Sequence, residues 1–382
     1  YLTHYLQNHE NGASQYYQPR AETYFSKINE SLSIVEDSGI QAIIPLNWDI
    51  PFPPPQRPSF TFIDLFAGIG GFRIPLQELG GKCVFTSEFN PQAQKSYELN
   101  FGELPFGDIT KMNLDIVPYH DILCAGFPCQ PFSISGKLKG FEDTRGTLIY
   151  YVFKIIEKRK PKVVFLENVK HLWYHDNKKT LATIVKSLED LGYNISYKVL
   201  NANEFGVAQN RERVIIIGHQ EKVFDFKKLA KLPKIKLKEV LDKENDFEFL
   251  DEPVTILEDQ KLQDSGLVFA GYRNKTIRKA GVKPGTEHLS RVHKQPNRIY
   301  SSEGVHPALP SQETSGRFWI LHEGKVRKLT IQECYRIMGF PDNFLLHNNK
   351  GESYRQIGNS VCVPMIREVG RQIKEQLLDL TQ

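Results

Sequence analysis

One cysteine of this chain combines a nucleophilic atom with a rigid, polar setting. Cys129 stands in Pro128-Cys129-Gln130-Pro131, shortly after a predicted strand over residues 121–125. Open parallel sheets build ligand sites at such carboxyl ends of strands, and the flanking prolines restrict the loop. We interpret Cys129 as a nucleophile that attacks as its thiolate, with a buried structural thiol as the alternative. We expect that structural role for the other cysteines, Cys83, Cys124, Cys334 and Cys362.

A carboxylate and two arginines adjoin other predicted strands and could assist such a nucleophile. Glu167 ends the apolar strand predicted at residues 162–166, where a buried carboxyl group can act as an acid or a hydrogen-bond partner. Arg211 and Arg213 lie at the start of the strand predicted at residues 213–218. Taken singly, the acid could begin a helix and the arginines could be surface charges. Taken together, the three favour a catalytic group.

A glycine-rich turn joins a predicted strand to a predicted helix within Phe62-Ile63-Asp64-Leu65-Phe66-Ala67-Gly68-Ile69-Gly70-Gly71-Phe72. Such glycines let the main chain approach a ligand closely, and an acid about 20 residues later commonly holds ribose hydroxyls. Glu88 follows Gly68 at that interval, and Asp108 follows a later predicted segment. The two acids favour an adenosine-type cofactor over a tight turn without a ligand.

Short apolar runs alternate with helical patterns from residue 60 onward, which predicts an α/β fold with a doubly wound, mainly parallel sheet. Predicted strands cover residues 60–66, 82–87, 121–125, 162–166, 195–200 and 213–218. Predicted helices cover residues 71–79, 91–100, 147–158, 177–191, 330–338 and 363–380, with a further one near residues 21–35. The pattern becomes irregular after His219, which indicates a second, smaller domain with irregular strands.

Composition excludes several classes of protein. The chain has 382 residues, a net charge of +4, 40% hydrophobic residues and five widely spaced cysteines without a Cys-x-x-Cys pair. These features argue against a membrane protein, a disulfide framework and a metal site. We expect a soluble, cytoplasmic protein, since the first residues show no signal-peptide pattern.

Residues 271–300 carry eight basic side chains against the single acid Glu287, which favours a surface that contacts phosphates over a merely solvated basic face.

The order of these motifs resembles that of the DNA cytosine-5 methyltransferases of bacterial restriction–modification systems. The resemblance covers about residues 60–382 and runs through six segments, residues 64–72, 126–133, 166–169, 209–214, 327–341 and 356–363. The first 59 residues are not covered. The family implies an S-adenosylmethionine-dependent, Rossmann-like catalytic domain over residues 60–240 plus 355–382 and a target-recognition domain with a hinge over residues 241–354. Residues 1–59 would form an N-terminal extension that ends in a Pro-rich tether.

The resemblance also implies roles for particular residues. Cys129 would be the nucleophile, Glu167 would hydrogen-bond the cytosine ring, and Arg211 and Arg213 would steady the base and the nucleophile. Glu88 would hold the ribose of S-adenosylmethionine, and Phe89 would stand where relatives often have Trp against the adenine. The other residues implied for the cofactor pocket are Phe66, Gly68, Gly70, Asp108, Ile109, Pro128, Asn359 and Ser360.

The reaction implied is methyl transfer to carbon 5 of a cytosine flipped out of a short, specific duplex DNA sequence, through a covalent bond between Cys129 and carbon 6. Such an enzyme would act as a monomer, without a metal, and would protect host DNA from a cognate restriction endonuclease. Gln295 would enter the vacated place in the duplex. The other residues expected to contact DNA are Ser133, Arg291, Lys294, Arg298, Arg317 and Lys328.

Three alternatives follow from the same residues. A tRNA cytosine-5 methyltransferase would use a similar active site, although the long segment 241–354 favours duplex DNA. A catalytically silent, DNA-recognising protein would lack Cys129 or Glu167, and both are present. A nicotinamide-dependent oxidoreductase is disfavoured because the glycine spacing differs from Gly-x-Gly-x-x-Gly.

Overall fold

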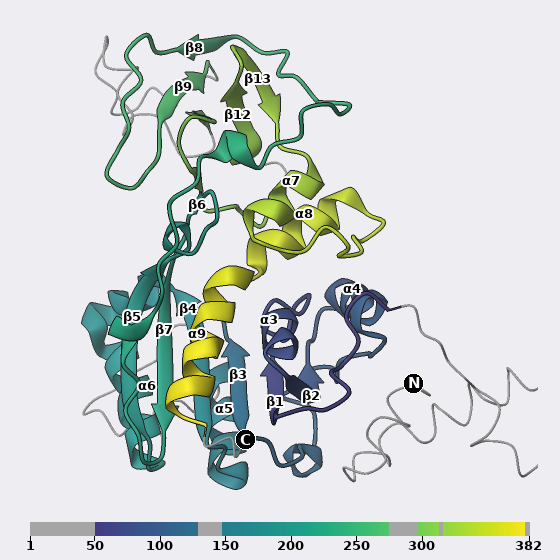
Figure 1. Ribbon diagram of the computed structural model, residues 1–382, viewed down its shortest axis with the longest axis vertical. Helices are drawn as coiled ribbons and strands as arrows, with labels where there is room; N and C mark the ends of the chain where they lie inside the picture. The colour runs from purple at the N-terminus through teal and green to yellow at the C-terminus, as the bar shows by residue number, and fades with distance from the viewer. Residues whose placement is uncertain (1–49, 129–146, 275–296, 313–315, 379–382) are drawn as a thin grey trace, which may run out of the picture.

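A computed structural model describes residues 50–128, 147–274, 297–312 and 316–378 of the chain. Its largest sheet has six strands in the order β2-β1-β3-β4-β7-β5 (Figure 1). Neighbours from β2 to β4 are parallel, whereas β7 runs antiparallel to both β4 and β5. The prediction of a mainly parallel sheet is therefore confirmed. The strands are β1 (Phe60–Leu65), β2 (Gly81–Ser87), β3 (Ile122–Gly126), β4 (Val163–Val169), β5 (Asn194–Asn201) and β7 (Glu212–His219).

Helices cover both faces of this sheet because successive side chains of a strand point to opposite faces. Val164 and Leu166 of β4 join a core with α5 (Leu148–Arg159) and α6 (Lys179–Asp190). Val163 and Phe165 join a second core on the other face. The helices of that face are α3 (Arg73–Glu78) and α9 (Val363–Gln376), the latter drawn in yellow across the front of the sheet (Figure 1).

A smaller sheet lies beyond the large one, at the top of Figure 1. It has five strands in the order β13-β12-β10-β9-β8, all antiparallel to their neighbours except β10 and β12. This second, strand-containing part agrees with the irregular pattern after His219. The strands are β8 (Val254–Ile256), β9 (Phe269–Arg273), β10 (Arg298–Ser301), β12 (Trp319–His322) and β13 (Lys325–Lys328).

Two short strands and two helices connect the sheets. Strand β6 (Gln209–Asn210) pairs in parallel with β11 (His306–Pro307), beside α7 (Ile331–Ile337) and α8 (Lys350–Asn359). Helix α7 begins at a capping box, in which the hydroxyl of Thr330 accepts from the Glu333 N–H and the Glu333 carboxylate accepts from the Thr330 N–H. The connection brings the last part of the chain back to the large sheet, where α9 completes the core. Among the residues described, no helix is long and apolar enough to cross a membrane.

Candidate active site

A cavity of about 820 Å³ opens at the carboxyl ends of β1, β2, β3 and β4. Ligand sites of open α/β sheets are expected at this edge. The cavity gathers residues that are up to 295 positions apart in the sequence, from Phe66 to Val361. The predicted site residues that line it are Phe66, Gly68, Glu88, Phe89, Asp108, Ile109, Pro128, Glu167, Arg211, Arg213, Asn359 and Ser360.

The glycine-rich loop between β1 and α3 forms one wall of the cavity. Gly68 has a φ of +55°, and a Cβ there would meet no atom within 4 Å, so its main chain faces open space. Gly70 has a φ of +84°, but a Cβ there would lie 2.2 Å from Cε2 of Phe101 on α4 (Pro91–Phe101). Gly70 does not line the cavity. The structure therefore gives Gly70 a packing role, although the sequence placed it with the cofactor residues.

Glu88 directly follows β2, and two main-chain donors hold its side chain. The Gly68 N–H donates to Oε2 at 2.9 Å and the Asn90 N–H donates to Oε1 at 2.8 Å. Burial raises the pKa of Glu88, while these hydrogen bonds oppose the rise. Each carboxylate oxygen can still accept further bonds from a ligand's hydroxyls. The Phe89 side chain beside it is 70% exposed and offers an aromatic face to the cavity.

Asp108 lines the same cavity, and its pKa is shifted in the opposite direction from that of Glu88. The Thr110 N–H and hydroxyl donate to Oδ1 of Asp108 at 2.9 Å and 2.8 Å. These bonds lower the pKa of Asp108, so it is ionised at neutral pH. The neighbouring Ile109 side chain is buried and supplies apolar surface. Asp108 thus adds a second fixed carboxylate, beside an apolar surface.

Glu167 and Arg213 meet in another part of the cavity, near the carboxyl end of β4. In the antiparallel pair of β4 and β7, Val169 is opposite Arg213 and Glu167 is opposite Ile215, so the two charged side chains are diagonal neighbours on one face. Arg213 Nε lies 2.8 Å from Glu167 Oε1. Burial raises the pKa of Glu167, while the Arg213 charge opposes the rise. A buried carboxyl group and a guanidinium therefore face the cavity together.

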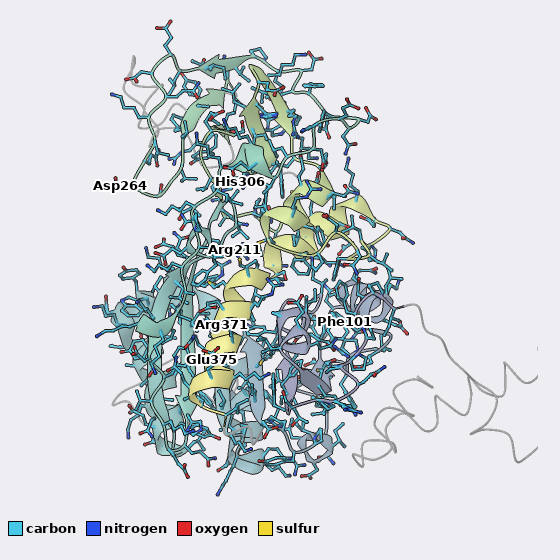
Figure 2. All side chains as sticks on the ribbon, in the orientation of Figure 1. Phe101, Arg211, Asp264, His306, Arg371 and Glu375 are labelled. Atoms are coloured by element: carbon cyan, nitrogen blue, oxygen red, sulfur yellow. The ribbon has the colours of Figure 1, made fainter. Side chains whose placement is uncertain are left out.

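Arg211 lies close to this pair, but its guanidinium is used by the main chain. Nη2 donates to Gly358 O at 2.9 Å and to Ser360 O at 2.7 Å, and Nη1 donates to Leu309 O at 3.4 Å. Burial lowers the pKa of Arg211. The positive charge at the carboxyl end of α8 also interacts favourably with the helix dipole. Figure 2 shows Arg211 at the junction, between the large sheet and His306.

The residues that line this cavity all lie within the part of the chain that matches a protein-family model. The family model described as C-5 cytosine-specific DNA methylase matches residues 60–375. The chain belongs to this family of DNA methylases.

Curated relatives agree with that assignment, and a solved structure shares the fold. The methylase is 40% identical over 334 residues to the type II methyltransferase M.HhaI of Haemophilus parahaemolyticus, covering 84% of this chain and 96% of that protein. It is 42% identical over 352 residues to the type II methyltransferase M.HpaII of Haemophilus parainfluenzae, covering 86% and 92%. The crystal structure of the S. pombe Dnmt2 methyltransferase shares the fold, with a TM-score of 0.59 at 18% identity over 83% of this chain and 99% of that one.

The C-terminal part of the methylase lines the cavity beside the glycine-rich loop. A Cβ on Gly71 would lie 2.8 Å from Ser360 Oγ and 2.7 Å from Val361 Cγ2, so the chain after α8 touches the loop directly. Asn359 is the last residue of α8. The predicted return of the C-terminus to this site agrees with the structure.

Two residues that the sequence interpretation did not assign contribute to the cavity. Asn168 is 2% exposed, and its Nδ2 donates to Phe127 O at 2.8 Å, which ties β4 to the segment that leads to Pro128. Gln356 lines the cavity and donates from Nε2 to Gln92 O on α4 at 3.0 Å. A polar residue in an apolar strand was the available signal for Asn168, whereas nothing local distinguishes Gln356.

Several predicted residues stand apart from the cavity. Arg317 donates to Ala308 O at 3.4 Å, and burial lowers its pKa. Lys328 lies 3.6 Å from Glu248, and Arg298 begins β10. Cys129, Ser133, Arg291, Lys294 and Gln295 lie outside the described residues, as does the helix predicted near residues 21–35. Within the described ranges, no cluster of three or more His, Cys, Asp or Glu side chains could hold a metal ion.

Proposed function

We propose that this methylase transfers a methyl group from S-adenosylmethionine to carbon 5 of a cytosine in duplex DNA, with Cys129 as the nucleophile. The observation that supports this most strongly is that Glu88 and the Glu167–Arg213 pair line one cavity. That cavity also includes Pro128, the residue before Cys129. A cofactor side and a base side therefore lie next to one another, beside the start of the Cys129 loop.

The residues around the glycine-rich loop, Glu88 and Asp108, here called the cofactor-side wall, fit S-adenosylmethionine. The cofactor supplies, when bound, an electrophilic methyl group on a positively charged sulfur. Glu88 would accept hydrogen bonds from the ribose hydroxyls, since both of its oxygens are already oriented by main-chain donors. The exposed Phe89 ring would pack on the adenine, with Asp108 as a polar partner. Phe66, Gly68, Ile109, Asn359 and Ser360 would complete the pocket.

Glu167 and Arg213, together with Cys129, fit an extruded cytosine. The Cys129 thiolate would add to carbon 6, which makes carbon 5 nucleophilic enough to accept the methyl group. Burial favours the protonated form of Glu167, which could donate to ring nitrogen 3 while Arg213 binds the ring oxygen. Loss of the carbon 5 proton and cleavage of the sulfur–carbon bond would then restore the aromatic ring and the free thiolate.

Arg211 would support this site rather than contact the base. Its donors hold the main chain of Gly358 and Ser360, which places the end of α8 over the cavity. The structure thus supports a positioning role for Arg211 in place of direct contact with base or nucleophile. Arg213, whose Nε faces Glu167, is the better candidate for contact with the base.

The smaller sheet would read the DNA sequence. The base must leave the stack to reach the cavity, at a cost of a few kcal/mol. Gln295 would fill the vacated place. Contacts to phosphates or base edges would come from Ser133, Arg291, Lys294, Arg298 and Arg317. We further propose that residues 241–354 form the recognition domain and hinge, and that a cognate restriction endonuclease is the functional partner, as expected for a type II methyltransferase.

Bisulfite sequencing of plasmid DNA treated with the protein and S-adenosylmethionine tests this proposal. We expect protected cytosines in one short sequence context with the wild type and none with Cys129→Ser. Cys83→Ser is the matched control, because burial raises the pKa of the Cys83 thiol to about 12 and excludes a thiolate at neutral pH. Protection by the Cys129→Ser protein, or modification of tRNA in place of DNA, would contradict the proposal.

A further inference from the structure

A short proline-rich segment lies before the family match, which begins at residue 60. Its sequence, Pro51-Phe52-Pro53-Pro54-Pro55, predicts a stiff tether between the first residues and the catalytic fold. In this segment, here called the strap (residues 51–55), Phe52 packs on a third hydrophobic core, which contains Phe101 of α4 and Phe344. The strap does not line the cavity. Its contacts nevertheless reach, through Phe101, the glycine-rich loop that forms one wall of the cavity.

Hydrogen bonds attach the strap to the two helices that follow the cofactor-side wall. The Phe52 N–H donates to Asn100 O at 3.1 Å, which satisfies a carbonyl in the last turn of α4. Gln77 Nε2, on α3, donates to Phe52 O at 3.2 Å and to Pro53 O at 3.1 Å. Helix α3 starts directly after the glycine-rich loop, and α4 starts soon after Glu88. The strap therefore joins the two helices whose first residues adjoin this wall.

The Phe52 ring supports the glycine-rich loop through one intermediate side chain. Its centroid lies 5.8 Å from that of Phe101, which is fully buried. Phe101 is labelled in Figure 2, on α4. Phe101 in turn lies so close to Gly70 that a Cβ there would be 2.2 Å from the ring. The Arg73 guanidinium lies 4.7 Å from the Phe101 centroid. Phe52 therefore contacts Phe101, and Phe101 contacts Gly70 of the loop.

The same ring also reaches the connection between the two sheets. The Phe52 centroid lies 6.0 Å from that of Phe344, in the segment between α7 and α8. The Asn100 side chain fixes that segment as well, since it accepts from the Leu345 N–H and donates to Leu345 O, both at 2.8 Å. Phe52 therefore fills the space where α4 meets the segment leading to α8.

We propose that Phe52 is a positioning residue for the cofactor, acting through Phe101 on the glycine-rich loop; this rests on the proposed use of S-adenosylmethionine. The loop includes Phe66 with a φ of 57°, an unfavourable conformation for a residue with a side chain. Such backbone persists when the surrounding packing fixes it. Removal of the Phe52 ring gives Phe101 room to move away from Gly70, so the loop loses its fixed shape and the cofactor binds less well.

Calorimetric titration with S-adenosylhomocysteine, together with steady-state kinetics on DNA, tests this role. Phe52→Ala should raise the Kd about 10-fold, within the range found for residues that do not touch the ligand. The KM for S-adenosylmethionine should rise with it, while kcat at saturating cofactor stays at the wild-type value, because Phe52 does not touch the reacting groups. Phe52→Leu should restore most of the affinity, since it refills most of the lost volume.

Phe226→Ala is the matched control. Phe226 is likewise a half-buried ring, 4.8 Å from the Phe224 ring, and it packs on the second core rather than on the core that contains Phe101. It should lower the melting temperature without changing the Kd. A Phe52→Ala Kd equal to that of the wild type, or an equal loss of affinity in Phe226→Ala, would overturn the positioning role. A wild-type protein that binds no S-adenosylhomocysteine would instead contradict the proposed function.

Discussion

Asp64, on the strand that leads into the glycine-rich loop, allows the effect of burial on a carboxyl pKa to be tested through protein stability. This strand β1 residue is fully buried, and among the described residues neither of its carboxylate oxygens has a hydrogen-bond partner. Burial raises its pKa from 3.8 to about 8; the Arg73 charge opposes the rise and Glu88 adds to it. We predict that Asp64→Asn, which removes the ionisable group with little change of shape, stabilises the protein increasingly as the pH rises.

The sign and size of this change in unfolding free energy follow from proton linkage. Between about pH 4 and pH 8 the folded protein holds the Asp64 proton and the unfolded chain does not, so the wild type loses stability as the pH rises through this window. Each tenfold change in proton affinity is worth about 1.4 kcal/mol. The stability of Asp64→Asn relative to the wild type should therefore increase by about 3.5 kcal/mol between pH 5 and pH 8.

Urea unfolding of both proteins at several pH values between 5 and 8 measures this difference, because titrations shared by the two proteins cancel. Asp121→Asn is the control. Burial raises the pKa of Asp121, but hydrogen bonds from Thr61 and the ion pair with Lys162 outweigh it, so the net pKa is lowered. Its loss should destabilise the protein equally at pH 5 and pH 8. An Asp64→Asn difference that does not change with pH would refute the reasoning.

Three further predictions concern packing and backbone conformation. Arg73→Met should cost about 3–5 kcal/mol of unfolding free energy, since it leaves Glu103 buried without the guanidinium that now donates to it at 2.6 and 2.7 Å. The double variant with Glu103→Leu should cost less in the same urea titration, and a larger cost would contradict this. Lys178→Gly should stabilise the protein by about 1 kcal/mol because Lys178 has a φ of 70°, and a loss of thermal stability would argue against it. Gly70→Ala should destabilise the fold through its φ of +84° and its contact with Phe101. Gly68→Ala should cost only the backbone strain of its φ of +55°, about 1 kcal/mol, because no atom lies within 4 Å of the added Cβ, and it should also weaken cofactor binding. A larger loss of thermal stability in Gly68→Ala than in Gly70→Ala would contradict this order.

The large sheet could be predicted because its strands are short apolar runs between helical patterns. The carboxyl-end rule then explains why Glu88 and Glu167, on different strands, line one cavity. The antiparallel direction of β7 was not predicted, since apolar runs do not show strand direction. It matters for the site, because this pairing makes Arg213 a diagonal neighbour of Glu167.

Long-range contacts account for most of what the sequence did not reveal. Arg211 donates to carbonyls 147 and 149 residues away, so no local pattern separates it from Arg213. The packing role of Gly70 depends on Phe101, and the strap depends on three rings from separate segments. Helix α8 was missed although Asn349 caps it by accepting from the Glu352 N–H; its two glycines obscure the helical pattern.

The covalent step of the proposed mechanism can be observed directly by mass spectrometry. After bisulfite sequencing has identified the target, a duplex with 5-fluorocytosine at that position is incubated with the protein and S-adenosylmethionine. Fluorine cannot leave as the carbon 5 proton does, so the bond between Cys129 and carbon 6 should persist. We predict a denaturation-resistant adduct whose mass is that of protein plus methylated strand, mapped to the peptide that contains Cys129 and absent from Cys129→Ser. An adduct on another residue, or an undiminished adduct with Cys129→Ser, would contradict the assignment of the nucleophile.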